Sequence, residues 1–74
     1  MSEIWHATQS VLDNDPGVDF LLMRPLLLGG WEAVFCEYTA SYGSHIEVMA
    51  AQGDTPPLAV EALLLAYYEE GMDE

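Results

Sequence analysis

The sequence predicts an α+β fold in which two helices pack against a three-stranded antiparallel sheet, in the chain order α-β-β-β-α. Segments with apolar residues at helical spacing lie near both ends of the chain. Between them lie runs rich in β-branched and aromatic residues, separated by glycine-containing turns. The chain has 74 residues and a hydrophobic fraction of 51%, which suffices for one small core. We therefore expect a single domain over residues 1–74.

The first expected helix spans residues 3–13. Ile4, Ala7 and Val11 recur there at the spacing of one helix face. The next four residues, 14–17, read Asn-Asp-Pro-Gly. Each of these residue types favours turns, so the helix should end before them.

Three strands should follow the first helix, over residues 18–28, 31–40 and 44–50. Gly29-Gly30 separates the first two, which predicts a β-hairpin because glycine reaches the positive φ of a tight turn without strain. Pro25 lacks the N–H that a ladder needs, so the first strand should lie at an edge of the sheet or carry a bulge.

The second expected helix spans residues 56–70. Asp54 or Thr55 can act as its N-cap. The two prolines that follow fall in the first turn, where a missing N–H is harmless. Strong helix formers then continue to Glu70.

The second strand is apolar on both of its faces. Alternation places Trp31, Ala33 and Phe35 on one face and Val34, Cys36 and Tyr38 on the other. A sheet that is buried on one side only should alternate more cleanly. Either a helix covers each face, or the second face meets a partner subunit. We expect the helices on opposite faces, as an α/β/α sandwich.

The charge of the chain excludes several functions. Thirteen Asp and Glu residues stand against one basic residue, Arg24, and the formal net charge is −12. Direct binding of nucleic acid or of an anionic membrane needs cationic side chains, so we expect neither. The single Cys36 cannot form an internal disulfide and fits a buried apolar position. No signal-peptide pattern or membrane-spanning run is present, so we expect a cytoplasmic protein.

No motif of enzyme chemistry is evident in the sequence. His6 and His45 belong to different elements, and a metal site would require them to meet a carboxylate such as Glu47. Their spacing fits no metal-ligand motif, and no oxygen-ligand loop for Ca²⁺ is present. We expect no catalytic residues, no metal and no cofactor.

The acidic excess is the most informative feature. A folded chain of this length is roughly 30 Å across, which gives roughly one net charge per 2.5 Å, against about one per 1.7 Å along duplex DNA. Such a surface can occupy the basic nucleic-acid channel of another protein, or it can serve solubility alone. The acids that we expect to contact a partner lie at the end of the first helix, in the loop after it and on the second helix: Asp13, Asp15, Asp19, Glu61, Glu69 and Glu70.

Two segments carry a resemblance to a known family. Residues 30–35, Gly-Trp-x-Ala-x-Phe, and residues 51–66, above all Gly-Asp-Thr-Pro-Pro-Leu-Ala at 53–59, resemble the small bacteriophage domains called ABA-sandwich domains. The match covers roughly residues 18–66. It implies a phage or prophage origin and helices on opposite faces of a small antiparallel sheet, with no catalytic residues to transfer. Glu61 stands where such domains often carry a basic residue, and it adds to the negative surface.

Charge and resemblance together suggest two hypotheses. The first is a phage-encoded, anti-CRISPR-like inhibitor that acts in the cytoplasm of the bacterial host. It would block a basic nucleic-acid-binding complex, such as a CRISPR effector, by presenting a DNA-mimicking negative surface. The alternative is a small phage accessory or assembly module that acts through homodimerisation, with the acidic surface serving solubility only.

Overall fold

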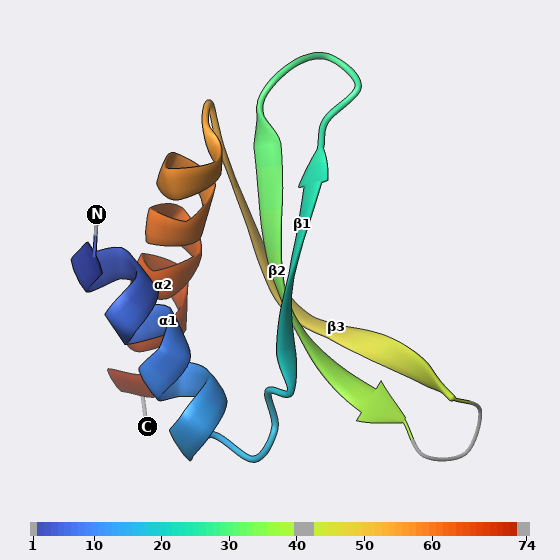
Figure 1. Ribbon diagram of the computed structural model, residues 1–74, viewed down its shortest axis with the longest axis vertical. Helices are drawn as coiled ribbons and strands as arrows, with labels where there is room; N and C mark the ends of the chain where they lie inside the picture. The colour runs from blue at the N-terminus through green and yellow to red at the C-terminus, as the bar shows by residue number, and fades with distance from the viewer. Residues whose placement is uncertain (1, 40–42, 73–74) are drawn as a thin grey trace.

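The computed structural model describes residues 2–39 and 43–72, and it confirms the α+β fold and the order α-β-β-β-α (Figure 1). The sheet has the order β1-β2-β3, and both neighbouring pairs are antiparallel. The elements are α1 (Ser2–Asn14), β1 (Phe20–Pro25), β2 (Trp31–Thr39), β3 (Ser44–Gly53) and α2 (Pro56–Met72). Residue 40, which the sequence assigned to the second strand, lies outside the described residues.

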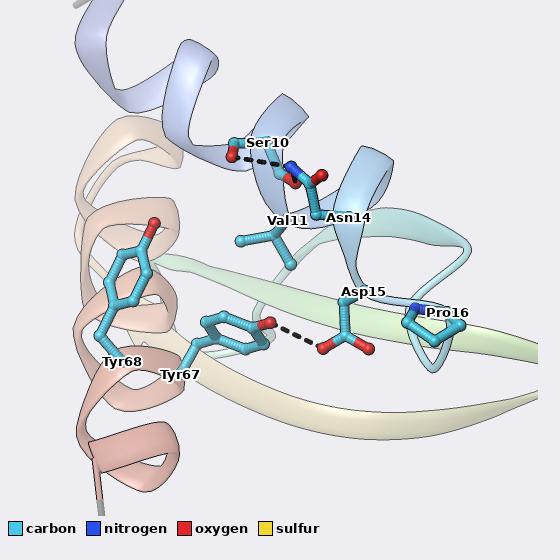
Figure 2. Close-up of a pocket in the computed structure, with 7 residues that line it drawn as sticks. All are labelled: Ser10, Val11, Asn14, Asp15, Pro16, Tyr67 and Tyr68. Atoms are coloured by element: carbon cyan, nitrogen blue, oxygen red, sulfur yellow. Dashed lines mark hydrogen bonds between the residues drawn. The ribbon is translucent and has the colours of Figure 1, made fainter.

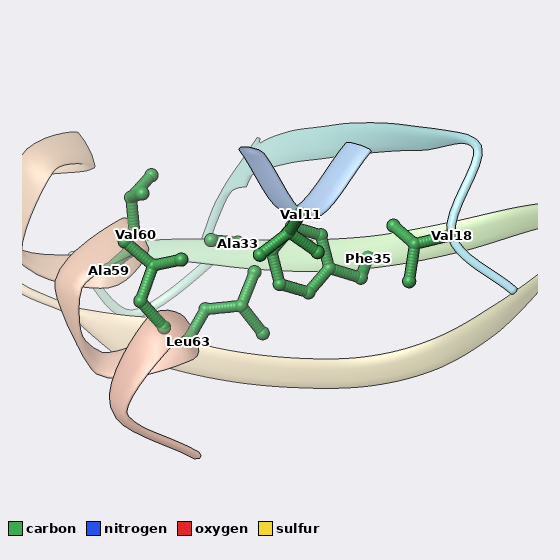
Figure 3. Close-up of a cluster of buried hydrophobic side chains, with 8 residues drawn as sticks. Val11, Val18, Ala33, Phe35, Ala59, Val60 and Leu63 are labelled. Carbon is green, nitrogen blue, oxygen red and sulfur yellow. The ribbon is translucent and has the colours of Figure 1, made fainter. Parts of the chain in front are cut away.

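Both helices cover the same face of the sheet, so the expectation of helices on opposite faces is wrong. Val11 of α1 and Leu63 of α2 belong to one buried cluster with Ala33 and Phe35 of β2 (Figure 3). Figure 1 shows α1 and α2 side by side on one side of the sheet. The protein is therefore a two-layer α/β sandwich with its core between the helix pair and the sheet.

The other face of the sheet is covered without a helix. Val34 and Cys36 point to this face and are fully buried. Arg24 of β1 donates to Glu32 of β2 at 2.6 Å and, through both terminal nitrogens, to Glu47 of β3 at 3.0 and 3.1 Å. Arg24 lies opposite Glu32, and Glu47 lies opposite Cys36, so this ion-pair network crosses the row that holds Val34. This network and the packed rings of Phe20, Tyr38 and His45 therefore share the face with Val34 and Cys36.

The β1–β2 hairpin turns where the glycine pair predicts. Gly29 and Gly30 have φ of 109° and 88°, and the N–H of Leu26 donates to the carbonyl of Gly30 at 3.0 Å. β1 is an edge strand that ends at Pro25, so residues 26–28 are loop rather than strand. Pro25 has no N–H to donate to the ladder, so the strand ends there although the next three residues are apolar.

The junction of β3 and α2 is tightly packed. β3 runs to Gly53, past the expected end at residue 50. Thr55 is the N-cap of α2, because its Oγ1 accepts from the N–H of Leu58 at 3.3 Å. A Cβ on Gly53 would lie 2.5 Å from the nitrogen of Ala59 and 2.6 Å from the carbonyl carbon of Leu58. Only glycine allows the helix to approach the strand this closely.

Candidate functional site

The two helices end at the same end of the molecule, and acidic residues gather there. Figure 1 shows α1 and α2 both running toward the lower part of the view. Neither helix has a basic residue in its last turn, so the partial negative charge of each helix C-terminus is not offset. We call this region the acidic end and define it as Asp13, Asp15, Glu69 and Glu70. It combines four carboxylates with two negative helix termini.

Asp15 joins the two helices at the acidic end. Its Oδ2 accepts from the hydroxyl of Tyr67 at 2.7 Å (Figure 2), and its Oδ1 accepts from the N–H of Gly17 at 2.8 Å. Both bonds lower the pKa of Asp15, and the bond from Tyr67 has the larger effect. Asp15 therefore stays charged to more acidic pH than an ordinary aspartate. The same hydrogen bond, together with burial, raises the pKa of Tyr67 to about 12. Asp15 therefore carries charge and also fixes the relative position of α1 and α2.

Replacing Tyr67 by phenylalanine tests this link. At about pH 7 we expect Tyr67→Phe to lower the free energy of unfolding by about 1 kcal/mol, because a half-buried hydrogen bond to a carboxylate is lost. The folded-state pKa of Asp15 lies below its ordinary value of 3.8. The bond therefore stabilises the fold above that pH, and its contribution is lost as pH falls through the lowered pKa. Urea unfolding across acidic pH measures the difference.

The alkaline side supplies the second half of that test. The pKa of Tyr67 is raised from 10.0 to about 12, so the contribution is also lost as pH rises between these values. Tyr68→Phe is the matched control, because no hydrogen bond of the Tyr68 hydroxyl is found within the described residues. A Tyr67→Phe deficit that stays constant across both pH limits would show that lost packing, and not the bond to Asp15, is responsible.

An open groove of about 250 Å³ lies beside this hydrogen bond, between the two helices. Figure 2 shows its lining residues: Ser10, Val11, Asn14, Asp15, Pro16, Tyr67 and Tyr68. The ring of Tyr68 lies edge-on to that of Tyr67, with centroids 5.5 Å apart, and Tyr68 is half-exposed. An aromatic face next to carboxylates suits a cationic side chain, which can contact the ring and pair with an acid together.

The structure does not bring all six predicted contact acids together. Four of them form the acidic end. Glu61 is exposed on α2 but lies eight residues before Glu69, which is about 12 Å along the helix axis. Asp19 precedes β1, and its Oδ2 accepts from the N–H of Tyr38 at 2.7 Å. Asp19 therefore continues the β1–β2 ladder by its side chain.

The sequence did not reveal which large apolar residues are exposed. Leu65 of α2 is 59% exposed and shares a helix face with Glu61 and Tyr68. α2 is apolar around most of its circumference, so its periodicity could not show which leucines face solvent. Leu27 and Leu28, at the tip of the hairpin, are 99% and 100% exposed. The sequence held one indication of this exposure: both leucines lie between Pro25, where the strand ends, and the turn at Gly29-Gly30.

The side chains considered for chemistry lie apart. His6 is exposed on α1, whereas the ring of His45 on β3 lies 5.4 Å from that of Phe20. Within the described residues, no three potential ligands converge on a possible metal position. Cys36 is buried, as predicted, and burial raises the pKa of its thiol, which disfavours the reactive thiolate.

Comparison with known proteins adds no relative. The chain matches no protein-family model, no curated protein and no solved structure. The resemblance to ABA-sandwich domains therefore stays a prediction that rests on the residues quoted for it. Over the described residues, neither helix combines the length and the apolar content that crossing a bilayer requires.

Proposed function

We propose that this protein binds the nucleic-acid-binding surface of another protein and excludes the nucleic acid from it, as a phage-encoded inhibitor of the anti-CRISPR type would. One observation carries the proposal. Arg24, the only Lys or Arg of the chain, is held by Glu32 and Glu47 on the sheet face away from the helices. Among the described residues, the acids of the helix layer thus have no Lys or Arg partner within the chain.

The spacing of charge supports this proposal. The longest dimension of the molecule is 34 Å. Dividing that length by the twelve net charges gives about 2.8 Å per charge, against about 1.7 Å along the axis of duplex DNA. The two values are of the same order. A lysine- and arginine-lined channel that accepts DNA can therefore pair with this surface at a similar density.

The acidic end provides the contact geometry. Asp13, Glu69 and Glu70 are exposed and can pair with the cations that otherwise hold phosphates. The half-exposed ring of Tyr68 adds a surface on which an arginine can lie. Inhibition would be competitive, and the long-range field would speed the encounter at low salt.

A competition assay tests the proposal. Purified RNA-guided DNA-binding effector complexes are incubated with labelled duplex DNA and increasing amounts of the protein. We expect DNA to be displaced from at least one complex, with an apparent affinity for the protein that weakens about tenfold or more between about 50 and 200 mM salt. A DNA-binding protein that reads its site with few cationic contacts is the control. Failure to displace DNA from any complex at the lower salt, or displacement that salt does not affect, would contradict the proposal.

The alternative function, an assembly module that acts through homodimerisation, has one observation in its favour. Leu58 and Leu65 are about half exposed on the outer face of α2, and their spacing of seven residues places them on one side of the helix, where a second copy can cover both. A homodimer that leaves DNA binding by every effector complex unchanged would favour this alternative.

A further inference from the structure

We propose that a second copy of this chain pairs antiparallel with the outer half of β3, residues 44–48, so that two three-stranded sheets join into one sheet of six strands. This inference goes beyond the proposed function and does not depend on it. It concerns the sheet, whereas the proposed contact with a cationic partner concerns the helix layer.

The two edges of the sheet differ in how far they are protected. β1 has six residues and ends at Pro25, which cannot donate a ladder hydrogen bond. β3 has ten residues and contains neither proline nor lysine, the residues that commonly protect an edge. Every residue from Ser44 to Val48 is exposed, and Figure 1 shows this part of β3 extending away from both helices. Its outer backbone groups are thus accessible to another strand.

The outer half of β3 also exposes apolar side chains. Ile46 is 51% exposed and Val48 is 48% exposed. The inner half differs, since Met49 and Ala51 pack against the core. Val48 is the extra residue of a β-bulge, because Phe35 pairs with Met49 while Cys36 pairs with Glu47. A bulge interrupts a regular ladder, so the paired segment should end there.

Charge selects a second copy over a cationic partner. Two molecules of net charge −12 repel each other, and they can approach best where the local charge is smallest. β3 carries one acid, Glu47, and both terminal nitrogens of Arg24 hold it. The segment therefore offers little attraction to a basic peptide, which would be drawn to the acidic end instead. Another copy therefore meets little repulsion at this segment, because it carries one acid and that acid is paired.

A two-fold axis through Ile46 gives a register without facing acids. Residues 44–48 are then centred on Ile46, which lies opposite Ile46 of the second copy. Glu47 lies opposite His45 of the second copy rather than opposite another Glu47. Like charges directly opposite each other destabilise a sheet, and this register avoids them.

Sedimentation equilibrium of the purified protein tests the dimer. We expect the wild type to dimerise and Ile46→Lys to weaken dimerisation at least about tenfold, because two lysines would face each other at the axis. Leu27→Lys is the matched control: it makes the same change in charge at an exposed apolar residue in the β1–β2 turn, away from residues 44–48, and dimerisation should be unchanged. A monomeric wild type, or equal weakening by the two lysine variants, would overturn the proposal. Circular dichroism checks that both variants are folded.

Disulfide cross-linking tests the register without disturbing the charge. With oxidised glutathione as the oxidant, Ile46→Cys should cross-link faster than Ser44→Cys, because only the residue on the axis meets its own copy. The native Cys36 is buried and should not interfere. Equal rates at the two positions would overturn the register centred on Ile46. Since neither experiment contains a cationic partner, a negative result here leaves the proposed function to be judged by its own assay.

Discussion

Gly53→Ala is expected to lower the free energy of unfolding by about 3 kcal/mol, and the melting temperature by roughly 12 to 24 °C for a chain of this size. The added methyl group would lie 2.5 Å from the backbone nitrogen of Ala59 and 2.9 Å from its Cα. These atoms belong to the first turns of α2 and cannot move as a flexible side chain can. The helix must shift away from β3, and the core between them must open.

Gly43→Ala is the control for that substitution. Gly43 has a φ of 64°, and an added Cβ would meet nothing within 4 Å. Alanine there introduces backbone strain of about 1 kcal/mol without a steric clash. Thermal and urea unfolding should therefore show a clearly larger loss for Gly53→Ala. If the two variants lose the same stability, close packing at the junction is not what requires glycine.

The role of Gly53 gives a structural reason for the sequence at 53–59. That segment combines a glycine at a close contact, the N-cap Thr55 and a proline at the first helical position. All three features serve the transition from strand to helix. The segment that carries most of the family resemblance is thus accounted for by packing and capping, and the helices on opposite faces that the resemblance implied are not observed.

Local signals in the sequence were sufficient for the elements but not for the layers. The glycine pair predicted the hairpin, and Pro25 predicted that β1 lies at an edge or carries a bulge, of which the structure shows the edge. The apolar residues Val34 and Cys36 then suggested a helix on each face, which is wrong. What covers them includes the network from Arg24 to Glu47, residues 23 positions apart. No local pattern can predict such a contact, because it depends on the register of three strands.

For the candidate site, too, the sequence predicts local features but not how they come together in space. Exposure of the acids could be predicted from residue type, and the position of Asp13 and Glu69 near helix ends from the helix bounds. Their convergence could not, because it depends on how α1 and α2 lie on the sheet. The hydrogen bond that reports this arrangement joins Asp15 to Tyr67, 52 residues later. The groove beside it was likewise beyond any local pattern.

The largest effect on binding is expected from neutralising the exposed carboxylates of the acidic end. The triple variant Asp13→Asn, Glu69→Gln, Glu70→Gln removes three charges, so the net charge changes from −12 to −9. Asp15 is left intact, because its hydrogen bond with Tyr67 holds α1 against α2. We expect affinity for the displaced effector complex to fall roughly ten- to a hundredfold, since each exposed ion pair contributes up to about 1 kcal/mol. The salt dependence of the affinity should weaken as well, because fewer exposed ion pairs remain to be screened.

A second triple variant separates position from total charge. Glu3→Gln, Glu37→Gln and Asp54→Asn make the same change in net charge away from the acidic end. If binding depends on an arranged surface, this control should keep most of its affinity. The acidic-end variant should also keep its stability or gain slightly, because it removes negative charge next to two helix C-termini. Equal losses of affinity in the two variants would mean that net charge alone, and not the convergence of the helix ends, determines binding.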